Sequence, residues 1–115
     1  MSKHVFVVLT NAAAGREDEF NAWYNKVHIP QVLQIPGIVG AQPFTLSDVQ
    51  RIDPPYLYKY LALYDIDTDN LQETMSTLKK RVETGEVVMS DALSANRVSW
   101  IYHPITEKAV AKGTK

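Results

Sequence analysis

The stretch that decides the fold runs from residue 19 to residue 37 and reads EFNAWYNKVHIPQVLQIPG. Its aromatic and aliphatic residues recur at the spacing of a helix face, and the carboxylates at 17–19 suit the positive end of a helix dipole. Pro30 has no backbone N–H and disfavours helical geometry in the residue before it. We therefore predict an amphipathic helix over residues 16–28 that ends near His28.

Short apolar runs on both sides of this helix predict strands. The predicted strands cover residues 5–10, 38–46, 56–66 and 97–103. Pro43 cannot donate to a strand ladder, so the second strand is expected at a sheet edge or with a bulge. Tyrosines and leucines alternate along the third strand, which predicts that both of its faces are covered. The segment 86–95 has no single period and is expected to be irregular.

A second helix follows a predicted N-cap within residues 67–69 and stops at Gly85, because glycine readily adopts the left-handed conformation that ends many helices. Its apolar stripe comprises Leu71, Met75, Leu78 and Val82. The element order β-α-β-β-α-β predicts a ferredoxin-like α+β fold, in which a four-stranded antiparallel sheet carries both helices on one face. Residues 1–105 form the predicted domain, and residues 106–115 form a loose C-terminal tail.

The sheet face away from the helices has no cover in a single copy of this fold. The predicted strands at 56–66 and 97–103 carry aromatic and aliphatic residues on both faces. Large uncovered apolar surfaces mark association sites, and a two-fold dimer is the commonest way to bury one. The sequence thus predicts a homodimer that forms through this sheet face.

Composition narrows the functional classes. The chain has 115 residues, a net charge of −1 and no cysteine. Without an excess of positive charge, nucleic acid is not an expected partner. The lack of cysteine excludes disulfides, thiolate metal sites and a cysteine nucleophile, and it suits a reducing compartment. The apolar run at 5–9 is too short for a signal peptide and no run reaches membrane-spanning length, so we expect a cytoplasmic protein without a membrane partner.

His28 is the leading candidate for chemistry. It lies one helical turn beyond Tyr24, at the end of the aromatic side of the predicted helix. An imidazole there can exchange protons near neutral pH. Alternatively, the same side chain caps the helix C-terminus, where a cation is favourable. The residues alone leave both interpretations open.

The pattern Glu-Phe-Asn-x-Trp-Tyr-x-x-x-His-x-Pro over residues 19–30, with Pro36-Gly37 after it, resembles the first helix of the dimeric α+β barrel superfamily, particularly the ethyl tert-butyl ether degradation (EthD) family. The resemblance implies a homodimer whose two sheets form a barrel, with a cleft between sheet and helices in each subunit. It also implies that His28 faces this cleft. Relatives include muconolactone isomerases, cofactor-independent polyketide cyclases, quinol monooxygenases and haem-dependent enzymes, so the fold alone does not choose a reaction.

Other aromatic and amide side chains are weaker candidates. Tyr58 and Tyr60 are candidate catalytic residues, because a phenol hydroxyl can orient a substrate oxygen. The candidate ligand-binding residues are Asn21, Trp23, Tyr24, Tyr64 and Trp100. Each also has a plain structural interpretation: aromatic rings on strands and helices belong more often to a core or an interface, and the asparagine to an exposed surface.

Neither a metal nor a cofactor is predicted. His4, His28 and His103 fall on different elements, and no ligand spacing accompanies them. A haem would need an axial ligand, and His28 or His103 could serve only by assumption. The sequence also lacks a glycine-rich phosphate loop and a nicotinamide fingerprint.

These observations predict a cofactor-independent enzyme that acts on a small, largely apolar carbonyl or aromatic metabolite. His28 would act as general base or acid, with Tyr58 or Tyr60 orienting the substrate oxygen. Isomerisation, cyclisation and oxygenation would all use such a proton transfer. One alternative is a non-catalytic ligand-binding or stress-associated dimer. Another is a purely structural oligomer whose cleft is filled by its own side chains.

Overall fold

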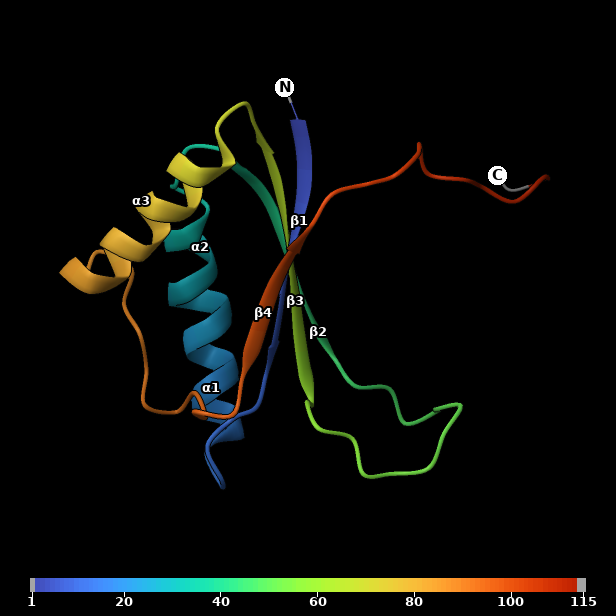
Figure 1. Ribbon diagram of the computed structural model, residues 1–115. Coiled ribbons are helices and arrows are strands. Elements are labelled where there is room, and N and C mark those ends of the chain that lie inside the picture. The colour runs from blue at the N-terminus through green and yellow to red at the C-terminus, as the bar shows by residue number, and fades with distance from the viewer. Residues whose placement is uncertain (1, 114–115) are drawn as a thin grey trace.

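The computed structural model describes residues 2–113, and within them four antiparallel strands form one sheet (Figure 1). The strands, in the spatial order β2-β3-β1-β4, are β1 (Ser2–Thr10), β2 (Ile38–Thr45), β3 (Tyr60–Thr68) and β4 (Val98–Tyr102). The helical segments are α1 (Glu17–Trp23), the π-helical turn η1 (Tyr24–His28), α2 (Ile29–Val32) and α3 (Leu71–Thr84). They lie against one face of the sheet, which confirms the predicted ferredoxin-like α+β fold.

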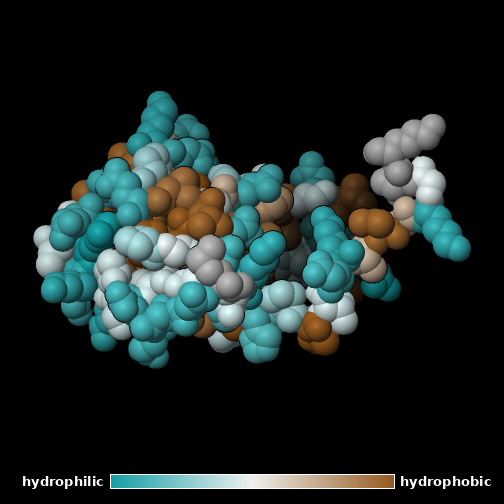
Figure 2. All heavy atoms as spheres, turned by 90° about the horizontal axis from the view of Figure 1, so that it is seen from above, coloured by the Kyte–Doolittle hydropathy of each residue, from teal (hydrophilic) through white to brown (hydrophobic). Residues whose placement is uncertain are grey.

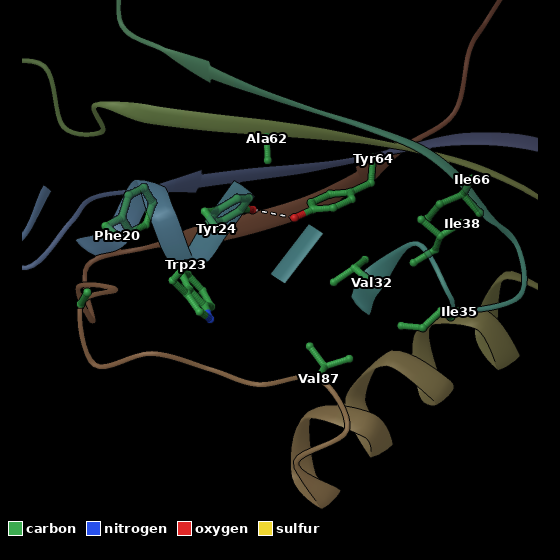
Figure 3. Close-up of a cluster of buried hydrophobic side chains, with 11 residues drawn as sticks. Phe20, Trp23, Tyr24, Val32, Ile35, Ile38, Ala62, Tyr64, Ile66 and Val87 are labelled. Carbon is green, nitrogen blue, oxygen red and sulfur yellow. Dashed lines mark hydrogen bonds between the residues drawn. The ribbon is translucent and has the colours of Figure 1, made fainter. Parts of the chain in front are cut away.

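The core lies between that sheet face and the helices. Strand β1 pairs with β3 from Ser2↔Thr68 to Thr10↔Tyr60, so alternate β3 residues turn toward the helices. The buried apolar side chains shown in Figure 3 come from both layers; they are Phe20, Trp23, Tyr24, Val32, Ile35, Ile38, Ala62, Tyr64, Ile66 and Val87. The predicted stripe of α3 packs against this cluster. Burial of these side chains is the main favourable contribution to folding.

The first helix continues past the residue where we predicted its end. Segments α1, η1 and α2 follow one another without a break, and Ile29, directly before Pro30, keeps helical dihedral angles (φ −58°, ψ −48°). The N–H of Ile29 donates to the carbonyl of Tyr24, five residues back, which widens the turn. Pro30 then stands in α2 directly after this widened turn, inside a continuous helical path. The prediction that the helix ends near His28 was therefore wrong.

Strand β3 begins at Tyr60, four residues later than predicted. The side chain of Asn11 fixes the preceding segment, because its Oδ1 accepts from the N–H of Lys59 and its Nδ2 donates to the carbonyl of Leu57. Residues 56–59 consequently follow an irregular path, and Tyr58 does not share the strand face of Tyr60.

Helix α3 starts slightly later than predicted and ends where expected. Its N-cap is Asn70, whose side chain accepts from the N–H of Glu73 at 3.1 Å, rather than a residue within 67–69. Gly85 ends it in the left-handed conformation with φ +83°. Pro43 lies on β2, an edge strand as predicted, and the register shift of that strand falls between Ile38 and Gly40.

Two segments outside regular structure matter for the site. Residues 86–97 run from α3 back to β4 and carry an isolated bridge between Ala12 and Leu93. After β4 the chain leaves the body of the molecule as an arm (Figure 2), on which Ile105 is 97% exposed. The last two residues of the predicted tail, 114–115, lie outside the described residues.

The second face of the sheet is free of helices in Figure 1. The strand register places on it, among others, Val7, Leu9, Leu61, Leu63 and Trp100. Trp100 is 53% exposed, an unusual state for so large an apolar side chain. Among the described residues, no helix has the length and apolar character needed to span a membrane.

Candidate functional site

A cleft of about 280 Å³ lies between the first helix, the sheet, α3 and the segment 86–97. His28, the last residue of η1, borders it together with Trp23 and Tyr24 from the same helix and Tyr64 from β3. The rest of the wall comes from β1, α3, β4 and the segment 86–97, and comprises Phe6, Val8, Thr10, Leu78, Val82, Met89, Leu93, Arg97, Val98 and Ser99. A mainly apolar cleft with a few converging polar groups is the usual form of a small-molecule site.

The imidazole of His28 packs against two aromatic rings. Its ring centroid lies 4.7 Å from that of Trp23 and 5.0 Å from that of Tyr24. Burial lowers the pKa of His28 from 6.5 to about 4, and the nearby backbone carbonyl of Val88 opposes this shift. His28 is therefore neutral at pH 7. Its Nδ1 is buried and has no hydrogen-bond partner among residues 2–113.

The helical path also bears on the alternative interpretation of His28. A cation near a helix C-terminus is stabilised only within the last turn. His28 is followed by α2 and is neutral at pH 7, so it neither ends the helix nor carries the charge that such a cap requires. The geometry thus favours a role in the cleft over the role of a helix cap.

Tyr24 and Tyr64 form a buried pair, with 2.6 Å between their hydroxyl oxygens (Figure 3). Burial raises the pKa of both phenols, and for Tyr64 the neighbouring Tyr24 raises it further. Both hydroxyls stay protonated at neutral pH. One proton lies in the bond between them, which leaves the other hydroxyl proton free to meet a ligand oxygen.

A second cleft of about 200 Å³ lies beside the first, between α1 and the edge strand β2. Asn21 and Tyr60 border it, and the side-chain amide of Asn21 donates to the hydroxyl of Tyr60 at 3.4 Å. Tyr24 and Thr10 border both clefts. The two clefts are therefore neighbours, and the Tyr24 side chain lies between them.

The structure divides the predicted site residues into three groups. His28, Trp23, Tyr24 and Tyr64 meet at the first cleft, whereas Asn21 and Tyr60 meet at the second. Tyr58 and Trp100 border neither cleft: Tyr58 lies before the start of β3, and Trp100 lies on the sheet face opposite the helices.

Sequence reasoning missed the segment that crosses the first cleft. Met89 and Leu93 border the cleft from this segment. Two side chains of the first helix hold its backbone, since the Trp23 Nε1–H donates to the carbonyl of Val88 at 2.9 Å and the Val88 N–H donates to Gln31 Oε1 at 2.6 Å. The segment has no hydrophobic period, so no signal in the sequence predicted these two hydrogen bonds to Val88.

A third hollow lies at the other end of the sheet, beside the start of the C-terminal arm. His4 and His103 meet there with their ring centroids 6.3 Å apart. Among the residues that the structure describes, no group of three or more histidine, aspartate or glutamate side chains is arranged to hold a metal ion.

Comparisons with known proteins place the fold. No protein-family profile and no curated protein sequence matches the chain. An EthD family protein from Bacillus halodurans is 14% identical over 91% of this chain and 100% of its own, with a TM-score of 0.59. A variant of MhuD, solved with two manganese protoporphyrin IX molecules per active site, is 11% identical over 93% and 99%, with a TM-score of 0.61.

A third match is a dimeric ferredoxin-like protein of unknown function from Thermobifida fusca, 11% identical over 90% of this chain and 92% of its own, with a TM-score of 0.54. Other matches, from Shewanella loihica and Nitrosomonas europaea, carry provisional monooxygenase names. At such low identity these similarities establish the fold and not the reaction. The chain has the ferredoxin-like α+β fold and is similar in structure to EthD family proteins, as the resemblance implied.

Proposed function

We propose that this chain is an EthD-like enzyme that binds a small, largely apolar carbonyl or aromatic molecule beside His28 and moves a proton on that molecule. The observation that carries the proposal is a neutral, partly buried imidazole at the wall of a mainly apolar cleft, with a buried Nδ1 that is unpaired among the described residues. An unpaired buried polar atom costs roughly 1–3 kcal/mol. The unpaired Nδ1 at the cleft wall therefore favours a bound ligand that supplies the missing hydrogen-bond partner.

His28 acts as a base in this proposal, because a group with a pKa of about 4 holds no proton to give at pH 7. The same low pKa makes it a weak base, so the substrate must present an acidic proton, such as a phenol O–H or a C–H between two carbonyls. Once His28 has accepted the proton, the nearby carbonyl of Val88 stabilises the imidazolium.

Removal of that proton leaves negative charge on the substrate oxygen. Tyr24 and Tyr64 line the same cleft and stay protonated, so the one hydroxyl proton that the bond between them does not use is suited to be donated to this oxygen. The pair therefore takes the role that the sequence assigned to Tyr58 or Tyr60. Tyr60 borders the second cleft and has no role in this proton transfer.

The proposed proton transfer uses no cofactor. A haem was the one cofactor that the fold suggested, and the MhuD variant holds a metal porphyrin. The cleft beside His28 measures about 280 Å³, below the range of roughly 300–1,000 Å³ that holds drug-sized ligands. The cleft does not fit a porphyrin, and no step of the proposed reaction uses one.

We also propose that two copies associate through the sheet face that carries Trp100. Apolar residues on this face and the dimeric relative from Thermobifida fusca support this assembly. An obligate interface of this kind buries on the order of 2,000 Å² or more. The absence of cysteine supports a reducing location, and we propose the cytoplasm.

A non-catalytic ligand-binding protein is the second candidate. The low pKa of His28 favours it, because a neutral imidazole is a good hydrogen-bond acceptor even where it is a weak base. In this case the cleft holds its ligand without chemistry.

Native mass spectrometry of the purified chain tests both candidates, because it identifies small molecules that the cleft retains. The wild type, His28→Ala and the control His103→Ala are then incubated with the retained molecule. Turnover that falls about a hundredfold in His28→Ala and is kept in His103→Ala supports the enzyme. Retention without turnover in any of the three supports the binding protein, and equal turnover in all three contradicts the role of His28.

A further inference from the structure

We propose that the ring of Tyr24 is the partition that limits the ligand to a single aromatic ring. This inference rests on the proposed function, since it concerns the ligand that the cleft beside His28 accepts. The second cleft, beside Asn21 and Tyr60, is in this proposal a neighbouring space that the Tyr24 ring separates from the first.

The position of the Tyr24 ring supports a partition. Its centroid lies 5.5 Å from that of Phe20, which borders only the second cleft, and 5.0 Å from that of His28, which borders only the first. Tyr24 itself is 5% exposed and borders both. The bond of 2.6 Å to the Tyr64 hydroxyl fixes the far end of the ring. The side chain is thus held at both ends between the two spaces.

The size of each space sets the ligand class. A cavity of roughly 150 Å³ is enough to bind benzene. The first cleft, of about 280 Å³, accepts one substituted ring, and the second, of about 200 Å³, could accept another if the partition were absent.

The lining of the second cleft sets the chemistry of that additional ring. Its polar groups include the amides of Asn21 and Asn25 and the hydroxyl of Tyr60, and no charged side chain is among the described residues that line it. Neutral donors and acceptors of this kind suit a hydroxyl or a carbonyl rather than a carboxylate. Removal of the Tyr24 ring should therefore admit neutral linked-ring phenols.

The test uses two probes, phenol and 4-phenylphenol, which differ by one ring. Isothermal titration calorimetry on the full chain gives the ratio of their affinities for the wild type, Tyr24→Ala, Tyr24→Leu and Tyr24→Phe. Both shortened variants should raise the preference for 4-phenylphenol about tenfold or more over the wild type, because an additional ring is buried. Tyr24→Phe loses the hydroxyl but keeps the ring, so its ratio should stay within about threefold of the wild type.

Tyr24→Leu guards against loss of fold, since it keeps an apolar side chain in the core, and circular dichroism checks each variant. An unchanged ratio in the shortened variants, with phenol still bound, would overturn the partition alone. An equal rise in Tyr24→Phe would overturn the assignment to the ring. If the wild type binds neither probe, the proposed ligand class fails, and the inference fails with it.

Discussion

Burial of His28 makes a prediction about stability as a function of pH. The pKa of this imidazole is lowered from 6.5 to about 4, chiefly by burial among aromatic side chains. Between these two values the unfolded chain binds a proton at His28 and the folded chain does not. The free energy of unfolding must therefore fall as the pH is lowered from about 6.5 to about 4, and it must be unaffected by His28 above that window.

The magnitude follows from the same two values. A pKa difference of one unit corresponds to about 1.4 kcal/mol. The lowered pKa of His28 should therefore reduce the free energy of unfolding by about 3 kcal/mol near pH 4, relative to neutral pH. This is a large fraction of the roughly 5–15 kcal/mol that stabilises an ordinary domain. Acid should consequently weaken the fold well before most carboxylates are protonated.

Urea unfolding of the wild type and His28→Gln at intervals from pH 4 to pH 8 measures this contribution. The glutamine cannot take up a proton, so the difference in unfolding free energy between the two proteins should change by about 3 kcal/mol across the window. His103→Gln, which removes an exposed imidazole outside the cleft, serves as the matched control and should follow the wild type. A constant difference between the wild type and His28→Gln from pH 4 to pH 7 would refute the reasoning.

Three further sets of substitutions test other parts of the structure. Trp23→Ala should cost roughly 3–5 kcal/mol in urea unfolding, and Trp23→Phe, which loses only the bond to the Val88 carbonyl and part of the ring, roughly 1–3 kcal/mol. A Trp23→Phe variant as stable as the wild type would contradict the hydrogen bond to Val88. Trp100→Glu should convert a dimer to a monomer in analytical ultracentrifugation, whereas a monomeric wild type would contradict the proposed assembly. Gly37→Ala should be more destabilising than Gly85→Ala. Both glycines have positive φ, but a Cβ at Gly37 would lie 2.6 Å from the hydroxyl of Thr74 on α3. The reverse order in thermal unfolding would argue against this packing.

The order of the elements could be predicted from the sequence because hydrophobic period and breaker residues report local geometry directly. The stripe of α3, its stop at Gly85 and the edge position of Pro43 are all of this kind. The element order predicted the ferredoxin-like fold class, and the resemblance of residues 19–37 added the similarity to EthD family proteins; the structure and the comparisons confirm both.

What could not be predicted depends on contacts between distant residues. The start of β3 shifts because the Asn11 side chain, 48 positions away, bonds the N–H of Lys59. The segment 86–97 lies over the cleft because side chains of another helix hold the backbone of Val88. Neither contact leaves a periodic trace in the sequence. The separation of the candidate residues into two clefts likewise depends on the position of a single ring, that of Tyr24.

Pro30 connects the incorrect prediction to the geometry of the site. In a regular α-helix, residues five positions apart point about 140° away from one another, so Trp23 and His28 would diverge. The π-helical turn before Pro30 has a bond from residue i to residue i+5 and brings such residues onto the same side. The rings of Trp23 and His28 accordingly lie 4.7 Å apart at the wall of one cleft. The residue that suggested the end of the helix therefore marks the irregularity that places the imidazole in its aromatic surroundings, and these lower its pKa.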